Sequence, residues 1–232
     1  MSEANFSAVV LTAAPPGHSS DGGGPFMKLD GREAVLRSVE LFLNRPNIPQ
    51  IMLVVSSENE EEVKRKYGGN LGFMGVKLVV GGKKWQEQIS AAAPKISAEA
   101  TQVLIHDAAR PLTPYGDIDA LLEAAVKHAA VVLATPVRSS LLEVDQGGAP
   151  VALRPPGEFM LMQSPLAMSH ARFNELIGGR LVHPSEWTIV QGSHLNIRMG
   201  GAGDASLAKA MLNLMPKPKA KAPSNPFEEA QW

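Results

Sequence analysis

The sequence predicts an α/β fold, a three-layer sandwich with a mostly parallel, Rossmann-like central sheet and a protruding β-arm. Apolar runs of strand length recur, helical patterns lie between them, and the alternation breaks once, near residue 140. The runs are continuous rather than alternating, as expected of strands that helices cover on both faces. We place these strands at residues 8–11, 51–55, 76–80, 103–105 and 131–134.

Helical patterns fill the intervals between these strands and extend the fold beyond them. We expect helices over residues 33–43, 60–67, 84–93 and 118–128, the last with Asp117 as its N-cap. A helix over 166–177, a strand near 188–190 and a helix over 204–214 follow. Strand–helix alternation places ligands beyond the carboxyl ends of the strands, so functional residues are expected directly after each strand.

The β-arm is predicted where the alternation fails, between Pro136 and Pro165. A turn at residues 145–148 separates two short strand-like runs, so we read an arm over about 137–160. Residues 1–215 are expected to form one domain. The Pro-Lys-Pro-Lys-Ala-Lys-Ala-Pro run opens a flexible Lys/Pro/Ala-rich tail over 216–232.

Composition narrows the class of partner. The 232 residues carry a formal net charge of -1, which gives no field to gather nucleic acid or a membrane, so a small molecule is the expected partner. Cysteine is absent, which excludes a thiol nucleophile and cysteine-bound zinc and favours a cytoplasmic protein. Neither an export signal nor an apolar run of about 18 residues is found, so membrane insertion is not expected.

The loop after the first strand is rich in small residues. Ala13, Ala14 and Gly17 let backbone N–H groups approach a phosphate, because no side chain blocks the way. The alternative, equally favoured by this composition, is a flexible loop that binds no phosphate. Its spacing is neither a Walker A sequence nor a dinucleotide fingerprint.

A second candidate segment, His106 to Pro111, closes a buried-type strand. Asp107 can hold a divalent cation that bridges phosphates, and Arg110 can meet a second phosphate. Alternatively, Asp107 caps the following turn and Arg110 pairs with it. For His106 a structural role is favoured over a catalytic one.

The hexapeptide from His106 to Pro111 is similar to a signature of the 2-C-methyl-D-erythritol 4-phosphate cytidylyltransferases and their ribitol-phosphate relatives. Other segments follow in the same order as in that family: the Ala13-Ala14 loop, Val80-Gly81-Gly82, Pro136-Val137-Arg138, Gln163-Ser164-Pro165, Gly192 and Asn196-Ile197-Arg198. The resemblance runs from Phe6 to Met215 and implies a nucleotidyltransferase domain of GT-A-like fold.

The resemblance also implies a reaction. The family joins CTP and 2-C-methyl-D-erythritol 4-phosphate to give 4-diphosphocytidyl-2-C-methyl-D-erythritol and pyrophosphate, with Mg²⁺ assistance, on the way to isoprenoid precursors. CTP and a sugar-alcohol phosphate are therefore the expected partners. A homodimer is expected by the same resemblance, because in the family such arms cross to the neighbouring subunit.

Site residues follow from the resemblance by position. Lys28 and Arg198 stand for catalytic cations, while Asp107, Arg110 and Arg138 stand for substrate-binding residues, with Asp107 also the expected magnesium ligand. The nucleotide-binding positions are Ala13, Ala14, Gly17, Gly81, Gly82 and Gln88.

The chain departs from the family in its first loop. The family reads Ala-Ala-Gly-x-Gly-x-Arg and then Pro-Lys-Gln, but here Pro15 replaces a glycine and Ser19 falls at the arginine. Lys28 lies two positions late, a slip of about 7 Å on an extended segment. Trp85 and Gln88 stand where the family has arginine and serine; Gln88 could hydrogen-bond a base, and Trp85 could stack on one, although packing is favoured for Trp85.

These departures leave three functions open. The chain is a cytidylyltransferase for the family's substrates, or a catalytically impaired member that binds a nucleotide or a partner. The third possibility is a nucleotidyltransferase for another sugar phosphate. The sequence leaves enzymatic activity itself undecided, because the cations of the first loop are missing.

Overall fold

The computed structural model describes residues 4–18 and 24–215 and has a seven-stranded sheet at its centre. The strand order is β11-β7-β10-β6-β1-β4-β5, and every strand except β10 runs in the same direction. This mostly parallel sheet confirms the predicted fold class. The strands are β1 (Phe6–Leu11), β4 (Gln50–Ser56), β5 (Lys77–Gly81), β6 (Gln102–Asp107), β7 (Ala130–Pro136), β10 (Met160–Ser169) and β11 (Thr188–Gln191).

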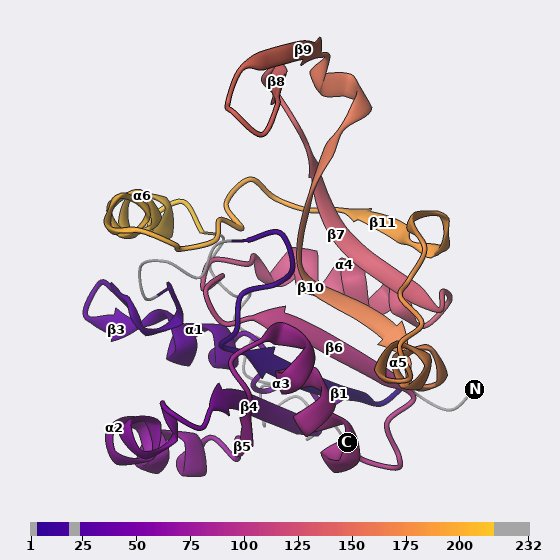
Figure 1. Cartoon of the computed structure of the whole chain (residues 1–232). Helices are drawn as coiled ribbons and strands as arrows, with labels where there is room; N and C mark the ends of the chain where they lie inside the picture. The colour runs from indigo at the N-terminus through magenta and orange to yellow at the C-terminus, as the bar shows by residue number, and fades with distance from the viewer. Residues whose placement is uncertain (1–3, 19–23, 216–232) are drawn as a thin grey trace, which may run out of the picture.

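Helices cover both faces of this sheet. In Figure 1, α3 (Trp85–Ala92) and α5 (His170–Ile177) lie in front of it, and α4 (Tyr115–Ala125) lies behind it. The helices α1 (Ala34–Glu40) and α2 (Glu60–Phe73) pack into the same core cluster as α4. Strand β1 feeds both layers: Ala8 and Val10 join the cluster of α1, α2 and α4, while Val9 and Leu11 join that of α3 and α5. Because successive side chains of a strand point to opposite faces, a strand buried on both faces needs a continuous apolar run, and such a run predicted β1.

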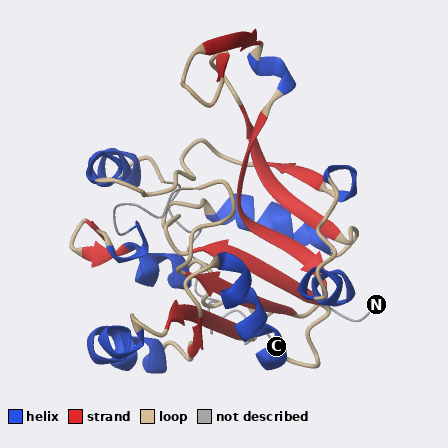
Figure 2. Ribbon diagram, viewed as in Figure 1, coloured by secondary structure: helices blue, strands red, loops and turns tan. Residues whose placement is uncertain are grey.

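Loops that follow the parallel strands gather at one edge of the sheet (Figure 2). A smaller apolar cluster lies there, formed around Leu29, Leu112 and Met199 with α6 (Ala202–Leu212). The remaining elements are the short pair β2 (Lys28–Leu29) and β3 (Arg32–Glu33) and the 3-10 helices η1 (Gly24–Phe26), η2 (Ala93–Lys95), η3 (Pro156–Glu158) and η4 (Pro184–Glu186).

The β-arm stands away from the body of the domain at the top of Figure 1. Its tip is the hairpin of β8 (Leu141–Val144) and β9 (Pro150–Arg154). Asp145 forms the turn, because its Oδ1 accepts hydrogen bonds from the backbone N–H groups of Gly147 at 2.8 Å and Ala149 at 2.9 Å. Much of the arm's surface is apolar: Leu142, Val144, Val151, Leu153 and Leu161 are each more than half exposed.

The prediction of a helix over 166–177 is wrong for residues 166–169. Residues 166–169 belong to β10, where Leu166 pairs with Ile105 of β6 and with Val132 of β7. Leucine, alanine and methionine favour a helix, but pairing between two buried strands outweighs that preference. The helix begins at His170, and the Ser169 hydroxyl caps it by accepting the N–H of Arg172 at 3.2 Å.

Other helix boundaries also differ from the prediction, and α1 ends at Glu40 rather than at residue 43. Helix α2 continues past residue 67 to Phe73, through Gly68, Gly69 and Gly72, because Leu71 is buried in the core and holds the last turn. Helix α4 begins at Tyr115 rather than 118, so Asp117 lies in the first turn and is not the N-cap. Its carboxylate accepts the N–H of Ser193 at 2.7 Å instead.

The predicted tail over 216–232 lies outside the described residues. The boundary at 215 between domain and tail therefore stays a prediction. Among the helices that the structure describes, none is both long enough and apolar enough to cross a bilayer.

Candidate active site

Asp107 is the last residue of β6 and is buried at the carboxyl edge of the sheet. Its Oδ1 accepts the backbone N–H of Ala109 at 2.9 Å, and its Oδ2 accepts the Arg198 Nε–H at 2.7 Å. The carboxylate thus caps the turn that follows, which was one of the alternatives from sequence. Its arginine partner is Arg198, which lies 91 positions later in the chain, and not Arg110.

Arg110 is buried beside this pair. Its Nη1 donates to the backbone carbonyl of Asn196 at 2.7 Å. Burial lowers the pKa of the Arg110 guanidinium, the nearby Asp107 carboxylate raises it, and the positive charge of Arg198 lowers it. Asp107 forms its ion pair with Arg198, and no ion pair of Arg110 occurs among the described residues. A buried guanidinium of this kind favours an anion.

Asn196 holds the loop after β11 against the rest of the site. Its Nδ2 donates to the Ser164 carbonyl at 2.8 Å, and its Oδ1 accepts the Thr113 hydroxyl at 3.1 Å. From the sequence, Asn196 served only as a marker of the family resemblance. Its structural role was indicated by its place between the apolar residues Leu195 and Ile197, because a buried amide side chain needs hydrogen-bond partners.

His106 is fully buried and its pKa is lowered to about 3, by burial first and then by the charge of Arg110. Its Nδ1 lies 3.2 Å from the Ser164 hydroxyl, which also accepts the Asp107 N–H at 3.0 Å. Its ring meets Phe42 edge-on, with the centroids 5.3 Å apart. A neutral, packed imidazole that positions Ser164 fits the structural role favoured from sequence.

Gln88 connects two of the predicted nucleotide-binding segments. Its Oε1 accepts the Ala13 N–H at 3.0 Å, and its Nε2 donates to the Thr12 hydroxyl at 3.2 Å and to the Gly82 carbonyl at 3.2 Å. Both amide hydrogens are used, so Gln88 has no donor left for a base unless one of these bonds breaks. The role of Gln88 as a base contact remains a prediction.

The glycines beside Gln88 are required by close packing. A Cβ on Gly81 would lie 3.0 Å from the Gln88 Cα, and one on Gly82 would collide with the Glu87 carboxylate. Gly17 has a φ of +81°, in the region that favours glycine. Ala14 is half-buried, and Gly17 is exposed.

Two predicted residues lie apart from Asp107. Lys28 lines a separate hollow of about 180 Å³ with Glu33, Glu62 and Tyr67. Arg138 is exposed, two residues after β7 at the base of the arm. The structure therefore brings together Asp107, Arg110 and Arg198, and places Lys28 and Arg138 elsewhere.

A chamber of about 400 Å³ opens beside the Asp107–Arg198 pair. Asp107, Arg110, Gln163 and Ser164 line one part of it, and Pro15 and Pro16 of the first loop line another. The remaining walls are largely apolar and come from α3, β10, α5 and the segment before β11. Sequence reasoning missed these walls, because their residues come from segments far apart in the chain.

The residues around Asp107 do not fit a magnesium ion held by the protein alone. Both carboxylate oxygens have donors, Ala109 and Arg198. No group of three acidic, histidine or cysteine side chains suited to a metal occurs among the described residues. Mg²⁺ prefers several oxygen ligands, and here one carboxylate would have to give up an arginine first.

Comparison with known proteins decides the lineage. A family described as "IspD: 2-C-methyl-D-erythritol 4-phosphate cytidylyltransferase" matches residues 7–154. The chain belongs to this family. The match includes the first loop, Asp107 and Arg110, and it stops before Asn196 and Arg198. The predicted resemblance is confirmed.

Curated members of the cytidylyltransferase family match over most of their length. The 2-C-methyl-D-erythritol 4-phosphate cytidylyltransferase of Clostridioides difficile (strain 630) is 27% identical over 222 residues, covering 89% of this chain and 94% of that protein. The one from Rhodopirellula baltica is 29% identical over 235 residues, with coverage of 89% and 94%.

Solved structures share the family fold. The 4-diphosphocytidyl-2C-methyl-D-erythritol synthase of Anaerococcus prevotii superposes with a TM-score of 0.73 at 18% identity, covering 91% of this chain and 97% of that one. The 2-C-methyl-D-erythritol 4-phosphate cytidylyltransferase of Thermus thermophilus gives a TM-score of 0.68 at 20% identity, with coverage of 88% and 98%. At these identities the likeness supports the fold alone.

Proposed function

We propose that the chain joins CTP and 2-C-methyl-D-erythritol 4-phosphate, releasing pyrophosphate and forming 4-diphosphocytidyl-2-C-methyl-D-erythritol. The observation that carries the proposal is the arrangement of Arg110 and Arg198 around the buried carboxylate of Asp107. This cluster lies where β6 ends, at the carboxyl edge at which ligands bind in mostly parallel sheets. Family membership supplies the reaction.

The cluster suits attack of one phosphate on another. In-line displacement at a phosphorus needs positioned positive charge far more than a covalent nucleophile, because negative charge spreads over the phosphoryl oxygens. Asp107 holds Arg198 through its Nε, which fixes the direction of the guanidinium. Asn196 holds Arg110 in the same way through its carbonyl. We assign phosphate binding to both arginines, with Asp107 positioning Arg198 and the Asn196 carbonyl positioning Arg110.

The other predicted residues keep their roles within the proposal. The nucleotide is surrounded by the backbone at Ala13, Ala14, Gly17, Gly81 and Gly82. Gln88 holds two of these segments together, through its hydrogen bonds to Ala13 and Gly82. Arg138 and Lys28 would reach phosphates held by Arg110 and Arg198 only through a rearrangement of their segments, since neither is among the residues gathered beside Asp107.

Magnesium enters the proposal only as an ion that accompanies the nucleotide. A triphosphate supplies most of the oxygen ligands that Mg²⁺ needs, so the protein need not hold the ion alone. Asp107 is the carboxylate predicted to meet it, and that contact would compete with Arg198 for Oδ2.

The β-arm is proposed to form a homodimer, as in the family. Its five strongly exposed apolar side chains support this, because a soluble domain seldom leaves so many together in water. A cytoplasmic location and the absence of nucleic-acid and membrane partners belong to the same proposal. The lack of cysteine and the net charge of -1 support these points.

A second candidate function is nucleotide binding without turnover. Gln88 uses both of its amide hydrogens inside the protein, and Lys28 lines a different hollow from Asp107. Each missing transition-state cation costs a factor of about 100 to 1,000 in rate. Transfer to another sugar phosphate is the third candidate, which an acceptor screen would reveal.

A pyrophosphate-release assay with CTP, Mg²⁺ and 2-C-methyl-D-erythritol 4-phosphate tests the proposal. We expect release that requires both substrates, and a loss of about 100-fold or more in Arg198→Met. Lys127→Met, an exposed lysine at the end of α4, is the matched control and should keep the full rate. Calorimetric binding of CTP without release would favour the second candidate.

A further inference from the structure

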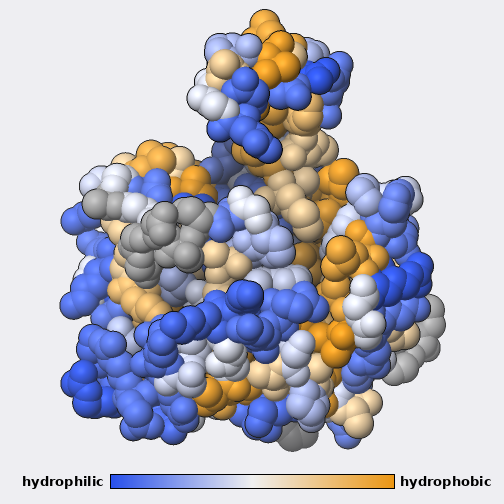
Figure 3. Space-filling view, in the orientation of Figure 1, coloured by the Kyte–Doolittle hydropathy of each residue, from blue (hydrophilic) through white to orange (hydrophobic). Residues whose placement is uncertain are grey.

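One wall of the chamber is apolar over most of its area. Leu166 and Met168 of β10, Leu176 of α5 and Trp85 at the start of α3 line it, together with Val182 and Trp187 from the segment before β11. Figure 3 shows apolar surface continuing down from the base of the arm on this face of the molecule. Pockets for small molecules have this character: largely apolar walls with a few placed polar groups, and volumes of about 300 to 1,000 Å³.

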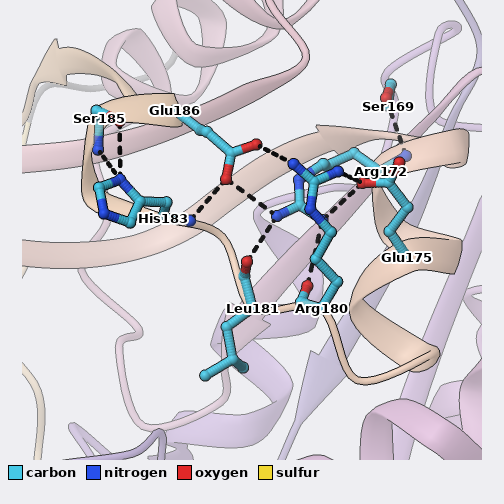
Figure 4. Close-up of polar contacts among 8 residues, drawn as sticks. All are labelled: Ser169, Arg172, Glu175, Arg180, Leu181, His183, Ser185 and Glu186. Atoms are coloured by element: carbon cyan, nitrogen blue, oxygen red, sulfur yellow. Dashed lines mark hydrogen bonds and ion pairs between the residues drawn. The ribbon is translucent and has the colours of Figure 1, made fainter.

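The segment that carries Val182 and Trp187 is fastened in place. Figure 4 shows Arg172 of α5 pointing into this segment, where its Nη2 donates to the Leu181 carbonyl at 2.8 Å and its Nη1 to the Arg180 carbonyl at 3.2 Å. The same guanidinium pairs with Glu175 at 2.9 Å and with Glu186 at 3.4 Å. Arg172 is itself buried, so these bonds are shielded from water.

A second set of contacts closes the segment on itself. Arg180 pairs with Glu175 at 2.6 Å and with Glu186 at 3.0 Å, and Glu186 accepts the His183 N–H at 2.7 Å. That backbone hydrogen bond, more than the arginine charges, lowers the pKa of Glu186. The apolar wall is therefore preformed, which reduces the entropy lost when a ligand binds.

Charged residues also line the chamber. Asp107 and Arg110 both line it, and Arg198 pairs with Asp107 on Oδ2. Arg110 is buried and forms no ion pair of its own among the described residues. An apolar compartment that ends at a buried guanidinium suits a molecule with an apolar body and one anionic group.

We propose that the chamber is a binding site for a small amphipathic anion, whose aromatic or hydrocarbon body lies against Trp85, Val182 and Trp187 and whose phosphate or carboxylate meets Arg110. The substrates of the proposed reaction do not fit these walls. Among the six apolar side chains, only the two indole N–H groups and the Met168 sulfur can form a hydrogen bond. A polyol would lose its hydration there without replacement.

Calorimetry on the full chain with simple probes tests this site, without CTP. The probes are 1-naphthyl phosphate, 1-naphthoate, 1-naphthol and glycerol phosphate. We expect the better of the two naphthyl anions to bind at least about tenfold more tightly than both naphthol and glycerol phosphate, since each of these lacks one half of the recognised chemistry. The better anion identifies the head group as phosphate or carboxylate.

Two variants locate the binding. Val182→Asp puts a charge in the apolar wall and should weaken binding of the naphthyl anion about tenfold or more. Leu207→Asp, at an exposed position of α6, should leave this binding unchanged. Melting curves of both variants check their folding. If Val182→Asp does not fold, Val182→Thr is the substitute, with a few-fold weakening expected.

Equal binding of all four probes, or a naphthyl anion that binds Val182→Asp as well as the original chain, would overturn the inference. The proposed transferase activity is measured with other ligands and could fail or succeed independently.

Discussion

At the scale of single residues, the site depends on one buried carboxylate. Asp107 faces Arg198 at 2.7 Å with only 1% of its side chain exposed, and Arg110 lies beside it without an ion pair of its own among the described contacts. Removing one partner of a buried pair leaves the other charge uncompensated. This cost exceeds what the pair itself contributes.

Asp107→Asn should therefore destabilise the protein by about 3 to 5 kcal/mol, because it removes the buried negative charge that accepts the Arg198 Nε–H. Urea unfolding at neutral pH measures the change. The control is Glu143→Gln, which breaks the exposed Glu143–Arg154 pair on the arm and should cost less than about 1 kcal/mol. Equal effects of the two substitutions would show that the Asp107 cluster is not tightly coupled.

His106 makes stability depend on pH. Its pKa in the folded protein is about 3, against about 6.5 when unfolded, so the folded state binds fewer protons between these values. The stabilisation is complete above pH 6.5 and is lost as the pH falls toward 3. From pH 7 to pH 5 the loss due to His106 alone should be about 2 kcal/mol.

His106→Asn removes this titration while keeping a polar side chain. The free energy of unfolding, measured at pH 7 and at pH 5, should then decrease by about 2 kcal/mol less in the variant than in the original chain. His128→Asn, at an exposed position after α4, is the control and should keep the original dependence. An unchanged slope in His106→Asn would mean that His106 binds the same number of protons in the folded and unfolded states.

At the scale of elements, Arg172 ties α5 to the segment between Gly178 and Trp187. Replacing it by methionine removes two hydrogen bonds to backbone carbonyls and two ion pairs, while keeping an apolar stem. We expect a loss of about 2 kcal/mol or more, since hydrogen bonds from a charged group contribute about 1.5 to 3 kcal/mol each. Backbone amides of the segment should exchange faster with solvent.

Hydrogen exchange followed by mass spectrometry measures that change. Arg180→Met serves as the comparison, because Arg180 is exposed and its backbone carbonyl still accepts from Arg172. Unaltered exchange in Arg172→Met would show that the segment is held by its apolar contacts alone.

The β-arm makes a prediction about assembly. Leu153 is 71% exposed, and Val151 is 60% exposed, on the outer strand of the hairpin. If arms bury these residues between two subunits, Leu153→Asp should shift the protein from dimer to monomer in sedimentation velocity. Leu207→Asp controls for added charge elsewhere. A monomer before any substitution would contradict the proposed homodimer.

Strand β10 shows where sequence reasoning stops at this scale. Residues 166–169 read as the start of a helix, because Leu, Ala and Met favour one, and nothing local records that β6 and β7 lie on either side. The hairpin turn at Asp145 was predictable, since its hydrogen bonds are made within five residues. Local turn chemistry can be read from sequence, whereas pairing with distant strands cannot.

At the scale of the whole molecule, the alternation of apolar runs and helical patterns was enough to predict the layers and the edge that carries the site. Asp107 and Arg110 were predictable because they directly follow a buried strand. The pairing of Asp107 with Arg198 was not, since 91 positions separate them. The chamber could not be predicted either, because segments far apart in the chain contribute its walls.

The missing cations of the first loop bear on the rate of the proposed reaction. Family membership indicates the reaction, while Lys28 lines a hollow separate from Asp107. With two arginines in place and two loop cations absent, we expect a slow transferase. Each missing cation lowers the rate by about 100- to 1,000-fold.

Phosphorus NMR of the purified protein with CTP, Mg²⁺ and 2-C-methyl-D-erythritol 4-phosphate is the decisive test of the proposed reaction, because it separates transfer from hydrolysis of CTP. We expect the resonances of a new diphosphate diester and of pyrophosphate to grow together, and both to grow about 100-fold or more slowly in Arg198→Met. Long incubation that leaves CTP and the acceptor unchanged, or yields CMP and pyrophosphate without the diester, would contradict it.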